Sequence, residues 1–582
     1  MPVLRHHPTG SPQTRRLDSL LFAYQITPFP TTMSSPSPST AVYNAHGSPA
    51  FFNSPLPEAA QLQVASGAHF DVVIIGSGAG GGTLARHLAP TGLKVLVLER
   101  GDWLPQEPQN WDAEAVFQQN RYVSHDPWLD KHGKAFQPGS HYFVGGATKM
   151  YGAAHFRLRQ QDFEELAHFD GISPAWPLRY ADFEPWYQKA EEMYHVHGQR
   201  GEDPTEPPCS GPYPHPPVAH EPRMQKLVDD LRSAGLHPFH APSGVMLDEA
   251  NLAFSRCRKC NCCDGFPCLV HAKSDAEVLG MRPALAAPNV SLLTRSQVKC
   301  LVTDESGHTV KAVELERDGE PLTVSGNVVV VSCGAANSAR LLLMSASDKH
   351  PRGLANGSDQ VGRNYMYHNS KAMVALAHEP NHTIFQKTVC INDWYFGDAE
   401  FDYPMGNIQM TGKTSGTIMK GYAPLETFLM PGWSMEKIAE HAIDFWVSSE
   451  DLPDPDNRVT LTGTGQIQLS YTPNNLTGST RLLRRLEGML DRLYLRNHLV
   501  ERQIYIANNM GIAAVGHQAG TCRFGSDPAS SVLDLNCKAH ELDNLYVVDT
   551  SFMPTIGAVN PSLTAIANAL RVGTHLAERL KG

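Results

Sequence analysis

The chain has 582 residues, 41% of them hydrophobic, so it is long enough for two or more domains with a sizeable core. Its 48 Lys and Arg against 59 Asp and Glu give a net charge of −11. This excess of acid argues against a nucleic-acid-binding surface, because neutralising phosphates requires clustered basic side chains. No apolar stretch approaches the ~20 residues of a membrane-spanning helix. We therefore expect neither a nucleic-acid partner nor a membrane span.

Residues 1–69 differ in composition from the rest of the chain. They are rich in Pro, Ser, Thr and His and show weak periodicity, which predicts a disordered N-terminal extension. Arg15 and Arg16 precede a short, broken apolar run that forms only a weak twin-arginine-like signal, and Met33 offers an alternative start. Without a clear signal peptide, we expect a cytoplasmic protein whose cysteines are mostly reduced.

Residues 70–101 predict a dinucleotide-binding unit. Residues 72–75 are a β-branched apolar run, typical of a strand buried on both faces. Gly76, Gly78 and Gly81 follow in the G-x-G-x-x-G spacing. In this pattern the first glycine permits a tight turn, the second lets the backbone approach a pyrophosphate, and the third lets the helix pack on the strand.

The same unit continues with a helix over residues 83–88, whose N-terminal N–H groups would face the phosphates. A second buried strand over residues 94–98 ends at Glu99, about 20 residues past the glycines, where an acid hydrogen-bonds the adenosine ribose. Strands on both sides and the acid in place predict an NAD or FAD site. This unit does not distinguish the two cofactors.

Further along the chain, the segment FVGGATKMYG places Gly145, Gly146 and Thr148 after an apolar pair. Small residues there suit backbone that lies close to a flat ligand. A Pro-rich surface loop over residues 201–222 and an amphipathic helix over residues 224–235 are predicted next.

Five of the 11 cysteines lie within residues 257–268. Taking Cys257, Cys260, Cys263 and Cys268 gives the spacing C-x2-C-x2-C-x4-C, and Cys262 makes the choice of ligands ambiguous. Three interpretations remain open: a metal ion or iron–sulfur cluster, one or two disulfides, or free structural thiols.

The segments after the cysteines are predicted to form several strands, the last of them over residues 327–332. A turn containing Gly334 and a helix over residues 339–344 are predicted after this strand. Beyond residue 368, short β-like runs alternate with polar loops and a helix over residues 479–495, without a nucleotide fingerprint, which predicts a substrate-side domain. The predicted strands cover residues 289–294, 297–303, 309–317, 321–324 and 327–332.

Two polar side chains near the C-terminus are the candidate catalytic residues. His517 lies in VGHQAGTCRFG, and Asn560 lies in VNPSLT after the strand-like run that ends at Asp549. A neutral imidazole can accept a proton near neutral pH. A carboxamide can hold an alcohol oxygen but cannot titrate. Pro561 and Ser562 begin a predicted helix over residues 562–571.

These segments together resemble the glucose–methanol–choline (GMC) family of FAD-dependent oxidoreductases. The matching pieces occur in order: VVIIGSGAGGG, GGATKMYG, VVVVSCGAANSARLLLMS, VGRNYMYH, LPDPDNRVTL and the tail just described. The resemblance covers roughly residues 70–582 and implies an α/β fold, in which a Rossmann-like FAD-binding domain is interleaved with an α+β substrate-binding domain. The expected FAD-binding segments are 70–175, 255–370 and 510–582, and the expected substrate-binding segments are 176–254 and 371–509.

The resemblance also implies a reaction. The expected activity is oxidation of a CH–OH group of an alcohol, a sugar or a glycoside, with hydride passing to flavin N5. His517 would be the base, Asn560 would position the substrate, and Asp549 would lie near the ribityl chain and pyrophosphate. Residues 148–151 contain no histidine for covalent attachment, which predicts dissociable FAD. The expected cofactor contacts are Gly76, Gly78, Ala79, Gly81, Glu99, Arg100, Gly145, Gly146, Thr148, Val298, Gly334, Asp549, Asn560, Pro561 and Ser562.

Three further expectations follow from the resemblance. Electrons would pass to O2 or to an external acceptor. Some sugar dehydrogenases of the family carry an iron–sulfur cluster that takes electrons from the flavin, and the cysteine-rich segment resembles theirs. Two alternatives stay open: a flavin-dependent lyase or isomerase on the same scaffold, and an FAD/iron–sulfur electron-transfer subunit.

Overall fold

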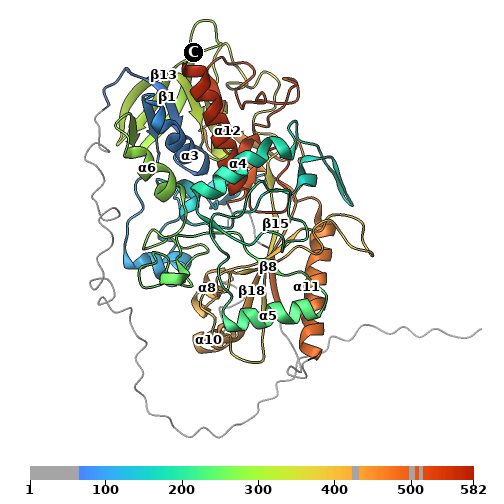
Figure 1. Cartoon of the computed structure of the whole chain (residues 1–582). Helices are drawn as coiled ribbons and strands as arrows, with labels where there is room; N and C mark the ends of the chain where they lie inside the picture. The colour runs from blue at the N-terminus through green and yellow to red at the C-terminus, as the bar shows by residue number, and fades with distance from the viewer. Residues whose placement is uncertain (1–63, 423–430, 497–504, 510–515, 582) are drawn as a thin grey trace, which may run out of the picture. The chain divides into compact units, whose positions relative to one another are not determined.

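The computed structural model describes residues 64–422, 431–496, 505–509 and 516–581 (Figure 1). Apart from residues 64–69, the predicted N-terminal extension lies outside the described residues, as do residues 510–515 of the last predicted FAD-binding segment. All described residues belong to one unit, Leu56–Gly582.

The described residues contain helices and strands from end to end. The helices are α3 (Ala79–Leu88), α4 (Tyr180–Met193), α5 (Pro222–Ser233), α6 (Arg282–Leu285), α7 (Ala335–Met344), α8 (Gly416–Tyr422), α10 (Gly432–His441), α11 (Leu476–Arg496) and α12 (Ser562–Lys581). The strands are β1 (Ala68–Ile75), β2 (Val95–Leu98), β3 (Trp128–Asp130), β4 (Ala135–Phe136), β5 (Leu166–His168), β6 (Gly171–Ser173), β7 (Val196–His197), β8 (Phe239–His240), β9 (Ser243–Gly244), β10 (Val290–Leu293), β11 (Ser296–Thr303), β12 (Val310–Arg317), β13 (Glu320–Val331), β14 (Met366–Tyr367), β15 (Asn369–Leu376), β16 (Val389–Ile391), β17 (Asn407–Met410), β18 (Ala442–Ser449), β19 (Arg458–Leu461), β20 (Ile467–Ser470), β21 (Tyr505–Asn509), β22 (Gln518–Ala519) and β23 (Leu545–Val547).

The first sheet has the strand order β10-β2-β1-β13-β12-β11, and β23 also pairs with β13. Strands β10, β2, β1, β13 and β23 run parallel, and β12 and β11 are antiparallel. The parallel strands are Val-, Ile- and Leu-rich, and their apolar carboxyl-terminal parts, such as residues 72–75 of β1 and 328–331 of β13, are buried, as expected where both faces of a sheet are covered. Figure 1 shows α3, α12 and α4 side by side next to this sheet, and α12 packs on both α3 and α4.

Two strands predicted separately, over residues 321–324 and 327–332, form the single strand β13. Ser325 and Gly326, which lie between the two predicted strands, both pair in register with β1, at His69 and Phe70. A Cβ on Gly326 would lie 3.0 Å from the Val73 side chain. The glycine therefore marks a close approach of two strands rather than a turn.

Two helices begin four residues earlier than predicted, α3 at Ala79 and α7 at Ala335. The first turn of α3 contains three glycines because its backbone packs against other backbone: a Cβ on Gly80 would lie 1.9 Å from the carbonyl oxygen of Val548, and one on Gly81 would lie 2.0 Å from that of Gly76. At the other end of the chain, α12 continues to Lys581, beyond the predicted end at residue 571.

The second sheet is antiparallel, with the order β21-β15-β18-β17-β16-β8. On one face, alternate residues of β18 such as Ile443, Phe445 and Val447 form an apolar core with side chains of α5 and α11. Figure 1 shows α5 and α11 beside β18 and β8. The opposite face of β18 carries Asp444 and Trp446 and is turned to the site described below.

A smaller sheet, β19-β20-β3-β4, is built from two distant parts of the chain. Strands β3 and β4 come from the segment assigned to FAD binding, and β19 and β20 come from the segment assigned to the substrate domain. Backbone pairing of Leu129 and Asp130 with Gln468 and Leu469 therefore joins the two predicted domains directly.

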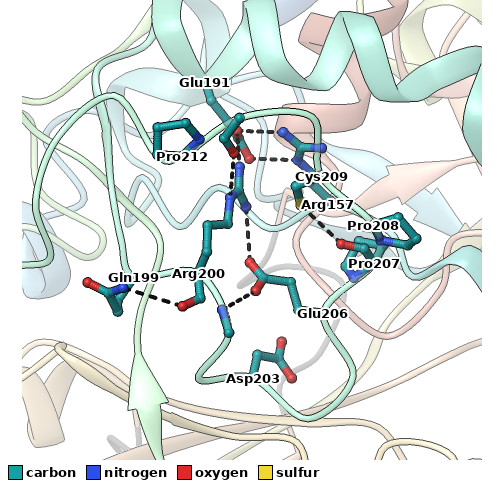
Figure 2. Close-up of polar contacts among 12 residues, drawn as sticks. Arg157, Glu191, Gln199, Arg200, Asp203, Glu206, Pro207, Pro208, Cys209 and Pro212 are labelled. Atoms are coloured by element: carbon teal, nitrogen blue, oxygen red, sulfur yellow. Dashed lines mark hydrogen bonds and ion pairs between the residues drawn. The ribbon is translucent and has the colours of Figure 1, made fainter.

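A network of buried charges holds the Pro-rich loop after β7 against α4 (Figure 2). Glu191 of α4 accepts two hydrogen bonds from Arg157, at 2.8 and 2.7 Å, and one from Arg200 of the loop, at 2.5 Å. Arg200 also pairs with Glu206, 3.1 Å away. One carboxylate thus pairs with two guanidinium groups, one of them on the loop, so this ion-pair network binds the loop to the helix.

Among the described residues, no helix is long and apolar enough to cross a membrane.

Candidate active site

A cavity of about 1430 Å³ lies where the two large sheets meet. One half is lined by the carboxyl ends of the parallel strands β1, β2 and β13 and by the N-terminus of α12, and the other half by β15, β17 and β18. Ligands of α/β sheets bind at the carboxyl ends of their strands. We call the first part the cofactor half and the second the substrate half.

The glycines of the cofactor half divide into packing positions and an open position. Gly76 has φ +101°, and a Cβ there would lie 2.2 Å from the carbonyl oxygen of Ser332. A Cβ on Gly78 would meet nothing closer than the Cα of Gly146, at 3.9 Å. Gly78 and Gly146 both line the cavity, so the gap beside them is a place where a ligand can approach the backbone.

Glu99 lies at the end of β2, as predicted, and its side chain is buried. Oε2 accepts hydrogen bonds from Ser77 N at 3.1 Å and Ser77 Oγ at 2.6 Å, and Oε1 accepts one from Gly101 N at 2.9 Å. Burial raises the pKa of Glu99, and these hydrogen bonds act in the opposite direction. A carboxylate offers about four acceptor positions, so one remains for a ribose hydroxyl.

Asp549 also lines the cavity, but its carboxylate is engaged by the protein. Oδ2 accepts from Gly334 N at 3.0 Å and Ser338 Oγ at 2.5 Å, and Oδ1 accepts from the N and Oγ of Ser551 at 2.8 and 2.5 Å. Asp549 therefore connects the β13–α7 turn to the end of β23 and caps the short helical turn that follows it.

Most residues predicted to contact the cofactor line this cavity, and two do not. Gly81 packs α3 against Gly76, and Gly145, with φ +96°, forms the turn that precedes Gly146. The predicted residues that line the cavity are Gly76, Gly78, Ala79, Glu99, Arg100, Gly146, Thr148, Val298, Gly334, Asp549, Asn560, Pro561 and Ser562.

Some side chains that line the cavity carry buried polar atoms without a hydrogen-bond partner among the described residues, and these atoms indicate what kind of ligand the cavity fits. Gln137 Nε2, Asn337 Oδ1 and Ser562 Oγ are buried, have no hydrogen-bond partner among the described residues, and belong to side chains that line the cavity. Burying such atoms without a partner is costly. With the open glycine edge and the N–H groups at the start of α12, they fit a dinucleotide that carries both donors and acceptors.

His517 lines the cavity and contacts a second histidine, His368. Their Nδ1 atoms are 2.9 Å apart, and the rings are perpendicular, with centroids 5.0 Å apart. The other nitrogen of His368, Nε2, lies 2.9 Å from the carbonyl oxygen of Gly557. Burial lowers the pKa of His368 to about 4, and burial followed by the proximity of His368 lowers the pKa of His517 well below 6.5.

These contacts assign the tautomer of His517. A carbonyl oxygen only accepts, so His368 Nε2 carries the proton and donates to Gly557. The neutral His368 ring then accepts at Nδ1, and His517 must donate from its own Nδ1. The lone pair of neutral His517 therefore resides on Nε2, the nitrogen that does not contact His368. This is the form that a general base requires.

Asn560 lines the same cavity just before α12. Gln409 of β17 donates from Nε2 to Asn560 Oδ1 over 3.0 Å. With Oδ1 engaged, the Nδ2 amino group of Asn560 is the end available to donate to a ligand. The cavity thus combines one acceptor, His517 Nε2, with one donor, Asn560 Nδ2.

Sequence reasoning missed four residues of this site: His368, Gln409, Asp444 and Trp446. The segment VGRNYMYH was recognised, but its final histidine was not singled out. Gln409 lies in a predicted strand without any local signal of chemistry. The ring centroids of Trp446 and His517 are 6.3 Å apart, although the two residues are distant in sequence.

The cysteine-rich segment borders the cavity without contributing thiols to its lining. Asn261, Asp264 and Phe266 line the substrate half, whereas Cys257 and Cys263 are buried behind it. Each of the eleven cysteines, all within the described residues, is a free thiol. Burial raises the pKa of Cys260 and of Cys262 to about 12 in each case.

No group of three or more His, Cys, Asp and Glu side chains in the described part of the chain could hold a metal ion. The four predicted ligands, Cys257, Cys260, Cys263 and Cys268, are therefore not brought together as a metal site. The iron–sulfur hypothesis remains a prediction from spacing.

Comparison with known proteins adds the family context. The model of the family described as GMC oxidoreductase matches residues 71–370 with its N-terminal part and residues 453–569 with its C-terminal part. The chain is 30% identical over 545 residues to 6'''-hydroxyparomomycin C oxidase of Streptomyces lividus, covering 88% of this chain and 92% of the relative. It is 31% identical over 532 residues to paromamine 6'-oxidase of Streptomyces fradiae, covering 86% and 90%.

Proteins of lower sequence identity to this chain are also named as oxidases or dehydrogenases. The fructose dehydrogenase large subunit of Gluconobacter japonicus is 24% identical, covering 88% of this chain and 98% of the relative. Among solved structures, pyridoxine 4-oxidase from Mesorbium loti superposes with a TM-score of 0.60 at 18% identity, covering 87% of this chain and 99% of that one. Formate oxidase of Aspergillus oryzae superposes with a TM-score of 0.61 at 16% identity, covering 89% and 100%. These two structures show the fold that this chain shares.

Proposed function

The chain belongs to the GMC oxidoreductase family, and we propose that His517 and Asn560 perform its reaction in the cavity between the two large sheets. The protein is an FAD-dependent oxidoreductase that acts on the CH–OH group of an alcohol or sugar. The interleaved α/β fold and the family match both agree with this activity.

The proposed roles follow from the protein's own hydrogen bonds. Asn560 donates from Nδ2 to the substrate oxygen and turns the carbinol carbon toward the cofactor half, while Gln409 prevents the carboxamide from rotating. His517 accepts the hydroxyl proton at Nε2. The bound FAD supplies the acceptor for the hydride. The N-terminus of α12 faces the cavity at Pro561 and Ser562, where its dipole stabilises negative charge.

The observation that carries this proposal is the Gly557–His368–His517 chain of hydrogen bonds. A lone histidine on a cavity wall is compatible with many roles. A buried histidine whose tautomer is set by a second histidine and a backbone carbonyl, with its lone pair on the remaining nitrogen, is prepared for accepting a proton.

FAD is proposed to be non-covalent. Within residues 148–151, Lys149 is buried in ion pairs with Asp275 at 2.9 Å and Glu277 at 2.7 Å, and the segment offers no histidine for attachment. Denaturing the holoprotein with acid should release the flavin into the supernatant. Yellow colour that stays with the precipitated protein would contradict this proposal.

The substrate is proposed to be a sugar or glycoside, because the similar proteins are named as oxidases of aminoglycosides and as a fructose dehydrogenase. The electron acceptor is proposed to be O2 or an external acceptor. No step is assigned to an iron–sulfur cluster, since the cysteines form no metal-holding group among the described residues.

The decisive test is the substitution His517→Ala. The variant should bind flavin and remain yellow, while kcat falls by about 10²–10⁴, the range that general-base catalysis contributes. Bleaching of the flavin after anaerobic addition of substrate would measure the reductive step directly and would separate oxidation from lyase or isomerase chemistry. His540→Ala is the matched control, since His540 belongs to the same C-terminal region but does not line the cavity. Near-normal bleaching in His517→Ala would overturn the assignment.

A further inference from the structure

One face of the second sheet forms a wall of the substrate half. Asp444 and Trp446 are two residues apart on β18 and therefore project from the same face. Trp446 is flanked across the sheet by Ala372 of β15 and Gln409 of β17. Asp444 is flanked on β15 by Val374. All five residues line the cavity.

Trp446 and the two residues paired with it across the sheet form a row that lies next to the proposed catalytic residues. The ring centroids of Trp446 and His517 are 6.3 Å apart, and Gln409, beside Trp446, donates a hydrogen bond to Asn560. The row that contains Asp444 is two residues further along the strand, about 7 Å away at the usual strand rise. A substrate that reaches from His517 to Asp444 must therefore extend past the indole.

The Asp444 side chain is buried, with 5% of the residue exposed, and only one of its two carboxylate oxygens accepts hydrogen bonds from the described residues. Oδ2 accepts from Gln386 Nε2 at 2.7 Å and from Thr414 N at 3.2 Å. No hydrogen bond from the described residues reaches Oδ1. Lys413 lies nearby, but its ammonium group donates to the backbone carbonyls of Asn381 and Glu440.

Trp446 adds an aromatic ring to the same wall. Its Nε1 is buried and has no hydrogen-bond partner among the described residues, so the ring carbons are what this side chain presents to the cavity. Asp444, two residues away on the same face, adds an acceptor. An aliphatic alcohol would leave Asp444 Oδ1 unpaired, which is unfavourable for a buried group. A hydroxylated ring could donate to Oδ1 and pack its C–H face against the indole.

We infer that Asp444 and Trp446 form a subsite for one sugar ring of the substrate, in which the Trp446 indole packs against the C–H face of the ring and Asp444 Oδ1 accepts from a hydroxyl or ammonium group. This inference rests on the proposed function and specifies its substrate class. Asp444 selects for a hydrogen-bond donor on the far side of the ring, and Trp446 selects for a ring with an apolar C–H face between that donor and the oxidised carbon.

The test compares three probes: methyl α-D-glucoside, methyl α-D-glucosaminide and n-hexanol. The wild-type holoenzyme should oxidise at least one glycoside with a kcat/KM about tenfold or more above that of n-hexanol, a difference of ~1.4 kcal/mol. Asp444→Asn, which replaces the free acceptor with a donor, should remove that preference while changing kcat/KM for n-hexanol less than about twofold. A larger loss for the glucosaminide than for the glucoside identifies ammonium as the preferred group, and equal losses identify a hydroxyl.

Two controls complete the design. Glu440→Gln removes a carboxylate on α10 that does not line the cavity and should leave all three probes unaffected. Calorimetric titration of the oxidised holoenzyme under anaerobic conditions measures binding without turnover. Unchanged preference in Asp444→Asn, or oxidation of n-hexanol alone, would overturn the subsite while leaving the proposed function intact. Asp444-dependent glycoside binding without any flavin bleaching would instead overturn the proposed function.

Discussion

At the scale of single residues, the site depends on pairs of side chains in which one partner orients the other. Gln409 engages Asn560 Oδ1, and His368 engages His517 Nδ1. Both orienting residues are buried and come from β17 and from the loop between β14 and β15. The reacting atoms are therefore defined by hydrogen bonds made before any substrate arrives.

We predict that His368→Leu lowers kcat/KM by about 10–100-fold, the range found for groups that orient metal-bound histidines. The loss should appear in kcat with little change in KM, because His368 positions the base rather than the substrate. His368→Asn, whose side-chain oxygen can still accept from His517 Nδ1, should recover most of the activity. Equal losses in the two variants would indicate a merely structural role.

The pH dependence of kcat/KM provides a second prediction at this scale. The pKa of His517 lies well below its ordinary value of 6.5 because of burial and the neighbouring His368. A base is active when it is deprotonated, so activity should stay level as pH falls to about 6.5 and decline only at lower pH. A profile with an acidic limb centred above pH 6.5 would contradict the lowered pKa.

At the scale of elements, the β1–α3 unit separates glycines required for packing from one required for the ligand. A Cβ on Gly80 would lie 1.9 Å from the carbonyl oxygen of Val548, whereas a Cβ on Gly78 would face the cavity. The same unit therefore contains glycines that serve the packing of the fold and one glycine that is open toward the cavity.

We predict opposite effects for two matched substitutions in this unit. Gly80→Ala should destabilise the apoprotein by about 1–3 kcal/mol, since the methyl group forces α3 away from β23. Gly78→Ala should leave the melting temperature of the apoprotein unchanged and weaken FAD binding by about tenfold or more, measured by flavin fluorescence titration. Equal FAD affinity in Gly78→Ala and wild type would show that the cofactor does not approach this edge.

At the scale of the whole molecule, long-range contacts connect segments that the sequence separates. The sheet of β3, β4, β19 and β20 joins both predicted domains, and the Arg157–Glu191–Arg200 network binds the Pro-rich loop to α4. These contacts hold the walls of the cavity in place from outside it.

We predict that Glu191→Gln lowers the free energy of unfolding by about 3–5 kcal/mol, because two guanidinium groups lose their shared counter-charge in a buried setting. Glu192→Gln, at the exposed neighbouring position on α4, should change stability by less than about 0.5 kcal/mol. Chemical denaturation of the two variants measures the difference. Similar stabilities for the two would mean that the network contributes little.

Local patterns in the sequence determined the class of this protein. The β-branched run of β1, the glycine spacing after it and the acid at Glu99 are consecutive in the chain, so they predicted a dinucleotide-binding unit without knowledge of the fold. The ordered motifs predicted the GMC family, the α/β fold and oxidation of a CH–OH group, and the family and structure comparisons confirm these predictions.

Only the tertiary structure decided how the site is arranged. The His368–His517 contact spans 149 positions, the Gln409–Asn560 bond spans 151, and the bond from Gly334 N to the Asp549 carboxylate spans 215. A hydrogen bond between residues so far apart leaves no periodicity or spacing in the chain that could reveal it. Sequence pattern therefore established which chemistry this protein performs. Side-chain contacts across the fold established which atoms face the substrate. The direction of a side chain in space depends on packing and not on order along the chain.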